Sequence, residues 1–105
     1  MAQLTIVYWR DIPAQVIVKA GRQSRWQFMQ KLPERFEQAI DRAAMRANMR
    51  DTDSYLSEWR RGEPIDCGDD LEAEAEAWAA KLEQDYDKEA VRKLVEQGGY
   101  AEPRG

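Results

Sequence analysis

Three adjacent residues near the N-terminus have side chains that could recognise an anion: Trp9, Arg10 and Asp11. The arginine guanidinium offers a planar set of donors to a carboxylate or phosphate, and the tryptophan ring offers a stacking surface beside it. Asp11 could orient Arg10 or accept a proton. In a purely structural interpretation, Asp11 closes a turn with its own backbone and Arg10 pairs with a helix carboxylate. Both interpretations place these candidate binding residues at a turn.

A second group of candidate binding residues centres on Arg25 and Trp26. Basic residues alternate with aromatic ones here, a pattern that can follow a nucleic-acid backbone and stack its bases, or contact a partner protein. The whole group comprises Arg22, Arg25, Trp26, Phe28, Lys31 and Arg35. Because the chain has a formal net charge of −4 and phosphate contacts dominate nucleic-acid affinity, we favour a protein partner.

The sequence is poor in the groups that usually carry catalysis. It has no histidine and one cysteine, Cys67, which excludes Cys–His and Ser–His catalysis and histidine-based zinc sites. Asp69 and Asp70 beside Cys67 oppose ionisation of its thiol. Glutamates of the following segment spread around a helix instead of converging on a cation. We therefore expect no catalytic residues and no metal ligands, and no cofactor is identified.

The length and composition indicate one folded domain. The chain has 105 residues, 43% of them hydrophobic and 10% aromatic, which is typical of a globular domain with one modest core. We expect the domain to span residues 1–99 and residues 100–105 to form a flexible tail. The lone cysteine and the lack of a signal or membrane-spanning segment predict a cytoplasmic protein without a membrane partner.

The non-helical part of the chain is N-terminal. Residues 3–10 and 15–20 are rich in β-branched and apolar residues and predict two antiparallel strands joined by a turn at residues 10–13. Residues 22–31 are either a third strand or an irregular segment. Both faces of the first strand are apolar, and a hairpin has at least one open edge. The hairpin is therefore predicted to bind a protein partner or a second copy of the chain.

Helical periodicity follows over most of the remaining residues. Helices are predicted at about residues 33–47, 52–61, 71–85 and 87–97. A loop precedes the third of these helices, and its residues 64–67 are either irregular or a short extended segment. The predicted fold class is α+β, with the N-terminal antiparallel hairpin, of two or three strands, packed against three to four α-helices.

Four strings of the sequence resemble a known family. YWRDIPAQVIV, LPERFEQAIDRAAMRA, DSYLSEWRR and DCGDDLEAEAEA are similar to the small bacterial domain called "virulence factor", and the resemblance spans roughly residues 4–99. It implies an intracellular bacterial protein, an accessory subunit encoded near folate- and corrinoid-dependent one-carbon enzymes. It implies no catalytic residues.

Three functions are therefore open. The first is a non-catalytic accessory or interaction subunit of a larger bacterial enzyme complex in one-carbon metabolism, docked through the hairpin. The second is a small anion- or cofactor-binding enzyme component that uses Arg10 and Asp11. The third is nucleic-acid binding through the basic N-terminal half, since residues 1–61 carry 11 Lys and Arg against 7 Asp and Glu.

Overall fold

The protein is an α+β domain, as the sequence predicts. The computed structural model describes residues 2–21, 25–49 and 51–102. Its elements are, in chain order, β1 (Ala2–Trp9), β2 (Ile12–Lys19), β3 (Gln27–Lys31), α1 (Glu34–Arg46), α2 (Thr52–Ser57), β4 (Trp59–Arg61), β5 (Ile65–Cys67), α3 (Leu71–Asp85) and α4 (Lys88–Glu96).

The sheet is antiparallel and places β1 in its interior. The strand order is β3-β2-β1-β4, and β5 also pairs with β1, beside the other end of that strand. Strand β3 confirms the third-strand interpretation for residues 27–31, whereas residues 22–24 lie outside the described ranges. Both strands of the hairpin therefore have neighbours on each side, so the open edge predicted for the hairpin belongs to β3 instead.

The hairpin turn is tighter than predicted. Trp9 pairs with Ile12, so the connection consists of Arg10 and Asp11 alone. The register then shifts between Val7 and Tyr8, where Tyr8 pairs with Pro13. This bulge explains how a proline lies inside a strand, because bulges leave ladder positions without a required N–H donor.

One predicted helix is shorter than its sequence pattern indicates. Helix α2 ends at Ser57, and Trp59–Arg61 form β4 instead of continuing the helix. Backbone pairing with Val7, Tyr8 and Trp9 of β1 satisfies peptide groups that would otherwise be left open at the centre of the sheet. The predicted extended piece after this strand is confirmed as β5.

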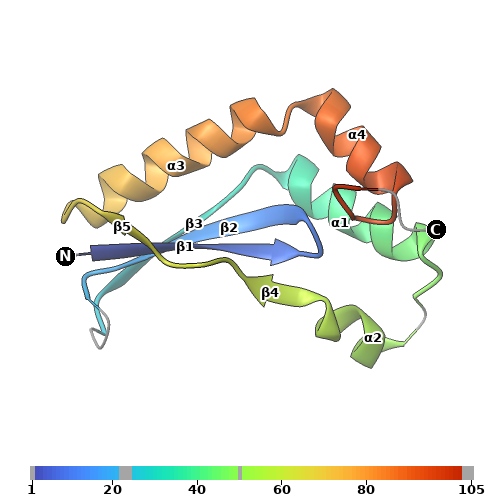
Figure 1. The fold of residues 1–105 in the computed structure, drawn as a ribbon, viewed down its shortest axis with the longest axis horizontal. Coiled ribbons are helices and arrows are strands. Elements are labelled where there is room, and N and C mark those ends of the chain that lie inside the picture. Colours follow the sequence, from blue (N-terminus) through green and yellow to red (C-terminus); the bar gives the residue numbers. More distant parts are fainter. Residues whose placement is uncertain (1, 22–24, 50, 103–105) are drawn as a thin grey trace.

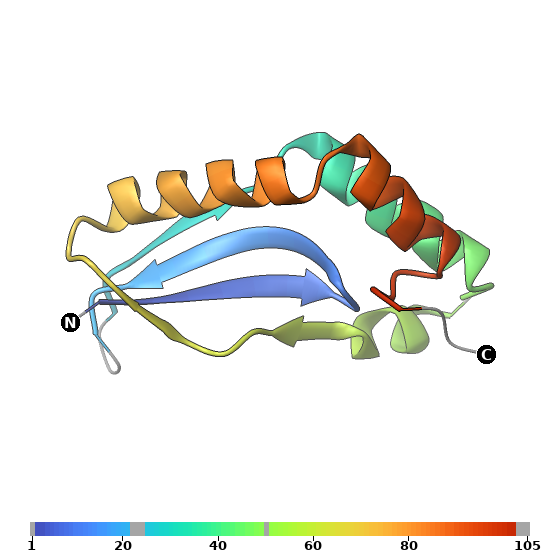
Figure 2. The same ribbon diagram turned by 45° about the horizontal axis from the view of Figure 1, so that its top comes forward.

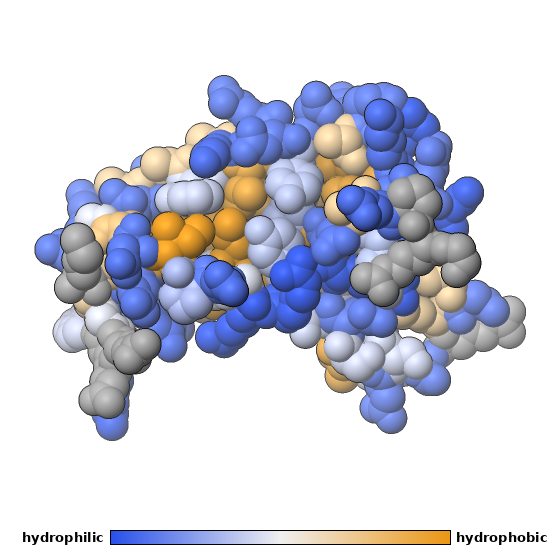
Figure 3. Space-filling model, in the orientation of Figure 1, coloured by the Kyte–Doolittle hydropathy of each residue, from blue (hydrophilic) through white to orange (hydrophobic). Residues whose placement is uncertain are grey.

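One face of the sheet carries most of the core. Helix α3 runs along this face, while α1 and α4 pack side by side beyond the hairpin turn (Figure 1 and Figure 2). Apolar side chains fill the space between α3 and the strands and are surrounded by hydrophilic surface (Figure 3). The buried sheet residues on this face are Ala2, Leu4, Ile6, Val16 and Val18.

Among the described residues, no helix runs along the opposite face of the sheet. It carries Gln3, Thr5 and Val7 of β1, paired with Lys19, Ile17 and Gln15 of β2. We call this the open face. No helix in the described ranges is both long enough and apolar enough to cross a membrane.

Candidate functional site

Trp9 is a core residue. Its side chain is 0% exposed, and its indole Nε1–H donates a hydrogen bond to the carbonyl oxygen of Tyr55 at 3.0 Å. The ring centroids of Trp9 and Tyr55 lie 5.7 Å apart. Trp9 therefore has no free ring face for a ligand or partner, and its predicted stacking role is replaced by a packing role.

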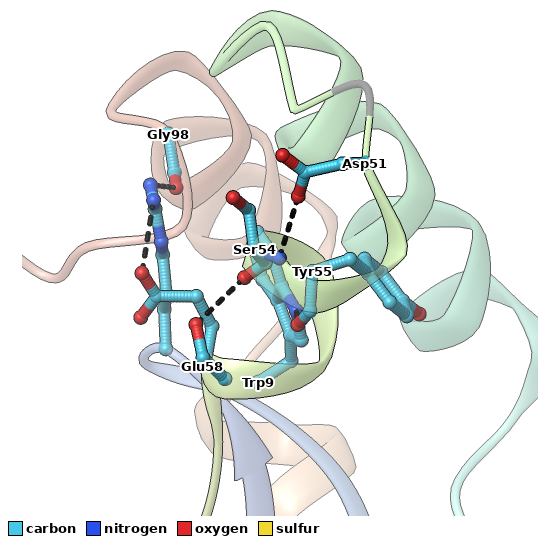
Figure 4. Close-up of polar contacts among 8 residues, drawn as sticks. Trp9, Asp51, Ser54, Tyr55, Glu58 and Gly98 are labelled. Carbon is cyan, nitrogen blue, oxygen red and sulfur yellow. Dashed lines mark hydrogen bonds and ion pairs between the residues drawn. The ribbon is translucent and has the colours of Figure 1, made fainter.

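Arg10 is bonded within the protein through both ends of its guanidinium. Nη1 donates to the carbonyl oxygen of Gly98 at 2.7 Å, and Nη2 lies 3.3 Å from Oε1 of Glu58 (Figure 4). The guanidinium carbon is 5.1 Å from the ring centroid of Trp9 and 4.5 Å from that of Tyr100. Pairing with a carboxylate at a helix end agrees with the structural interpretation of Arg10.

The backbone of Arg10 has an uncommon conformation. Its φ is +54°, in the left-handed region that favours glycine, and its N–H donates to the carbonyl oxygen of Glu58 at 3.0 Å. Such a conformation persists when the surroundings determine it. The bonds to Glu58 and Gly98 supply that determination here.

Asp11 binds distant parts of the chain instead of its own turn. Its Oδ1 accepts from Nη2 of Arg60 at 3.0 Å, and its Oδ2 accepts from the N–H of Ala101 at 2.6 Å. Its own N–H donates to the carbonyl oxygen of Gly99 at 2.8 Å. Within the predicted tail, Tyr100 and Ala101 thus contact the hairpin turn, whereas residues 103–105 lie outside the described ranges.

Together, Trp9, Arg10 and Asp11 form what we call the turn clamp. It attaches the α2–β4 segment and the segment after α4 to the hairpin. An anion at Arg10 would have to displace the Gly98 carbonyl or the Glu58 carboxylate, which are already hydrogen-bonded to the guanidinium.

Arg25 and Trp26 lie at the other end of β2 from the turn clamp. Both side chains are exposed, and Trp26 is 79% exposed. Strand β2 separates the two groups of predicted binding residues, so they do not form one site. In the second group, Arg35 is engaged, because it donates to the carbonyl oxygens of Tyr86 and Glu83 at 2.8 and 3.1 Å.

Sequence reasoning missed a groove on the open face. It has a volume of about 420 Å³ and lies where β1, β2 and the end of β3 meet α1, α2 and β4. Its lining residues are Val7, Ala14, Gln15, Lys31, Leu32, Glu37, Ile40, Tyr55 and Trp59. Apolar and aromatic side chains dominate this lining, and Lys31 and Glu37 are exposed charges of opposite sign.

The aromatic wall of the groove rests on the turn clamp. Tyr55 and Trp59 meet edge to face, with ring centroids 6.2 Å apart and an interplanar angle of 84°. Behind them lies the buried ring of Trp9, which holds the Tyr55 carbonyl. The sequence signal was the spacing of Tyr55 and Trp59, which resembles one face of a helix but belongs to a helix followed by a strand.

The phenol of Tyr55 is held in its neutral form. Burial raises its pKa above the usual value of 10.0, and the carboxylates of Asp41 and Glu37 raise it further. A group whose pKa is raised on folding contributes stability that is complete below the unfolded pKa and is lost as pH rises through the folded pKa.

We therefore expect the melting temperature of the wild type to fall above about pH 10, and to fall less in Tyr55→Phe. Melting curves from pH 8 to pH 11 on both proteins measure this. Tyr8 and Tyr86, whose pKa values burial also raises, leave part of the loss in the variant. An equal fall in melting temperature at alkaline pH in the two proteins would contradict the role assigned to the Tyr55 phenol.

Cys67 has the environment of an unreactive thiol. Burial raises its pKa, and the carboxylates of Glu74, Asp66 and Asp69 raise it further. A raised pKa lowers the thiolate fraction at neutral pH. Among the described residues, no three His, Cys, Asp or Glu side chains are arranged to hold a metal ion.

These features define a small α+β domain with a clamped hairpin, one helix-covered sheet face and a groove on the other face. The chain belongs to the virulence factor family, whose model matches residues 7–95, and this confirms the resemblance of the four strings. The matched range contains every residue that lines the groove. Searches of the curated proteins and of the solved structures found no match.

Proposed function

We propose that this protein is a non-catalytic accessory or interaction subunit of a larger bacterial enzyme complex, and that its groove holds an apolar or aromatic side chain of the partner. The observation that carries the proposal is the groove itself, whose lining combines the aromatic rings of Tyr55 and Trp59 with apolar side chains of the strands and of α1. Interface cores are enriched in aromatic residues, and binding energy concentrates where an anchor fills a desolvated pocket.

The chemistry of the groove supports binding more than turnover. Its polar side chains, Gln15, Lys31 and Glu37, stand among apolar neighbours, an arrangement that fixes the orientation of a bound group. The chain has no histidine for proton transfer near neutral pH, and Cys67 lines neither this groove nor the turn clamp.

The setting that we propose is the cytoplasm, within folate- or corrinoid-dependent one-carbon metabolism. The family resemblance supports this setting, and the acidic charge of the chain agrees with a protein partner instead of a nucleic acid. The hairpin contributes indirectly, because its turn clamp holds α2 and β4 in the position that forms the groove.

The variant Ala14→Leu tests the groove by filling it. Ala14 is a partly buried lining residue in the bulge of β2, so a larger side chain enters the open groove without deleting core atoms. We expect partner binding to weaken by about thirtyfold, because an excluded anchor residue costs about 2 kcal/mol. Quantitative affinity capture from the source cells identifies the partner, and calorimetric titration with the purified partner measures the loss.

The matched control is Ala77→Leu on the exposed side of α3, which makes the same substitution away from the groove. Both variants should melt near the wild-type temperature. Equal partner binding by Ala14→Leu and Ala77→Leu would reject the groove as the docking site.

A further inference from the structure

Strand β3 is a free edge of the sheet. Within the described ranges, its only sheet partner is β2, which it meets in an uninterrupted antiparallel register from Gln15↔Lys31 to Lys19↔Gln27. Met29, at its centre, is 53% exposed. A strand edge without a neighbour presents unpaired backbone donors and acceptors that another chain can use.

The register shows which peptide groups of β3 point outward. Leu32 donates to the carbonyl oxygen of Ala14, and Ala20 donates to that of Trp26, each at 3.0 Å. Hydrogen-bonded pairs alternate along an antiparallel ladder. The peptide groups of residues 28 and 30 therefore face β2, and those of Gln27, Met29 and Lys31 face away from the sheet.

The opposite edge of the sheet is less suited to pairing. Strands β4 and β5 have three residues each and are interrupted by residues 62–64, which include Pro64. Arg60 and Arg61 of β4 also place one positive charge on each face of this edge. Short strands, prolines and charged side chains protect a sheet edge from pairing with another chain. Of these features, β3 has one charged side chain, that of Lys31.

Helix α3 turns one flank towards β5. Oε1 of Glu74 lies 3.1 Å from the position that a Cβ would take on Gly68. The Glu74 carboxylate also raises the pKa of the Cys67 thiol in β5. Strands β5 and β3 lie on opposite sides of the β1–β2 pair. The other flank of α3 therefore lies above β3, next to which Figure 2 shows the helix.

That other flank is acidic. Residues two positions from Glu74 lie about 200° around the helix, which places Glu72 and Glu76 on the β3 side, and Glu83 follows Glu76 after about two turns. All three side chains are exposed. Arg35, four residues beyond the end of β3, donates to the carbonyl oxygen of Glu83 at 3.1 Å, which agrees with this placement.

We propose that β3 accepts an extended segment of a partner protein as an added strand, and that alternate side chains of this segment are lysine or arginine. Side chains of a strand alternate between the two faces of the sheet. The basic set would face Glu72, Glu76 and Glu83, and the intervening uncharged set would lie beside Met29 on the open face. A second copy of the chain fits less well, because it would bring two acidic flanks together.

The probe is a blocked heptapeptide that alternates valine and lysine, added to the intact protein and followed by amide hydrogen exchange. At a peptide concentration about nine times its Kd, the amides of Gln27, Met29 and Lys31 should exchange about tenfold more slowly. Those of Phe28 and Gln30 are already bonded to β2 and should change little. Unchanged exchange at the three outward amides would overturn the proposal.

Charge variants test the acidic flank. Glu76→Lys with Glu83→Lys should weaken peptide binding about three- to tenfold at low salt, whereas Asp53→Lys with Glu63→Lys, on exposed residues away from β3, should not. A heptapeptide that alternates valine and glutamate should bind more weakly than the lysine peptide. Equal binding of both peptides would overturn the charge assignment, and a sedimenting dimer that protects the same amides without peptide would show a second copy as the occupant.

The Ala14→Leu variant separates this surface from the groove. We expect it to bind the lysine peptide as the wild type does, since the outward edge of β3 does not include residue 14. Loss of peptide binding in this variant would place the peptide in the groove and overturn the strand-addition proposal.

Discussion

Trp9→Ala should lower the free energy of unfolding by about 3–5 kcal/mol, the usual cost of truncating a large aromatic residue in a core. The ring is fully buried, and its N–H holds the Tyr55 carbonyl. Deleting it leaves a cavity behind Tyr55 and removes a hydrogen bond between β1 and α2. Urea denaturation followed by circular dichroism measures the loss.

The chain supplies a matched control for this substitution. Trp26→Ala removes the same side chain from a position that is 79% exposed, and should change the unfolding free energy by no more than about 0.5 kcal/mol. Comparable losses from the two substitutions would show that Trp9 does not have the core role described. We also expect Trp9→Ala to weaken partner binding per folded molecule, because the aromatic wall of the groove loses its support.

Gly99→Ala should destabilise the protein by about 2–4 kcal/mol, from overpacking together with backbone strain. A Cβ at this position would lie 2.9 Å from Cζ3 of Trp9 and 3.2 Å from Cδ of Arg10. The φ of Gly99 is +96°, which side-chain-bearing residues rarely adopt. The substitution therefore pushes the C-terminal segment away from the turn clamp.

Gly21→Ala is the control for that experiment. A Cβ on Gly21 would meet no atom within 4 Å, so the change should be neutral or should stabilise the fold by up to about 1 kcal/mol. Thermal melts of both variants decide the comparison. A Gly99→Ala protein as stable as Gly21→Ala would mean that the segment after α4 does not press on Trp9 and Arg10 as described.

Local patterns determined most of the elements. Alternating apolar residues indicated the first two strands, and the helical spacing of Phe36, Ile40 and Ala43 indicated α1, whose apolar stripe is buried. Asp70 and Asp87 accept hydrogen bonds from Ala73 and Ala90 as helix caps, which are contacts over three residues. Signals of this kind are readable from sequence because the interacting groups are neighbours along the chain.

Long-range pairing decided the residues that matter most for function. Tyr55 and Trp59 have the spacing of a helix face, but pairing between Trp59 and Trp9, fifty residues apart, made Trp59–Arg61 a strand. The same pairing buried Trp9. An aromatic residue of the type that often anchors a binding partner therefore supports the groove from behind instead. Sequence periodicity reports whether a side chain is apolar, and only the tertiary structure decides which other segment covers it.

The sequence by itself therefore determined the α+β class, the hairpin, the family and the scarcity of catalytic groups, because each depends on composition or on short-range spacing. The tertiary structure decided that Arg10 and Asp11 hold the chain together, that the groove forms between β1, β2, α1 and α2, and that β3 carries the free edge. These features arise where segments far apart in the chain meet, since each segment can satisfy its apolar and hydrogen-bonding groups with several partners.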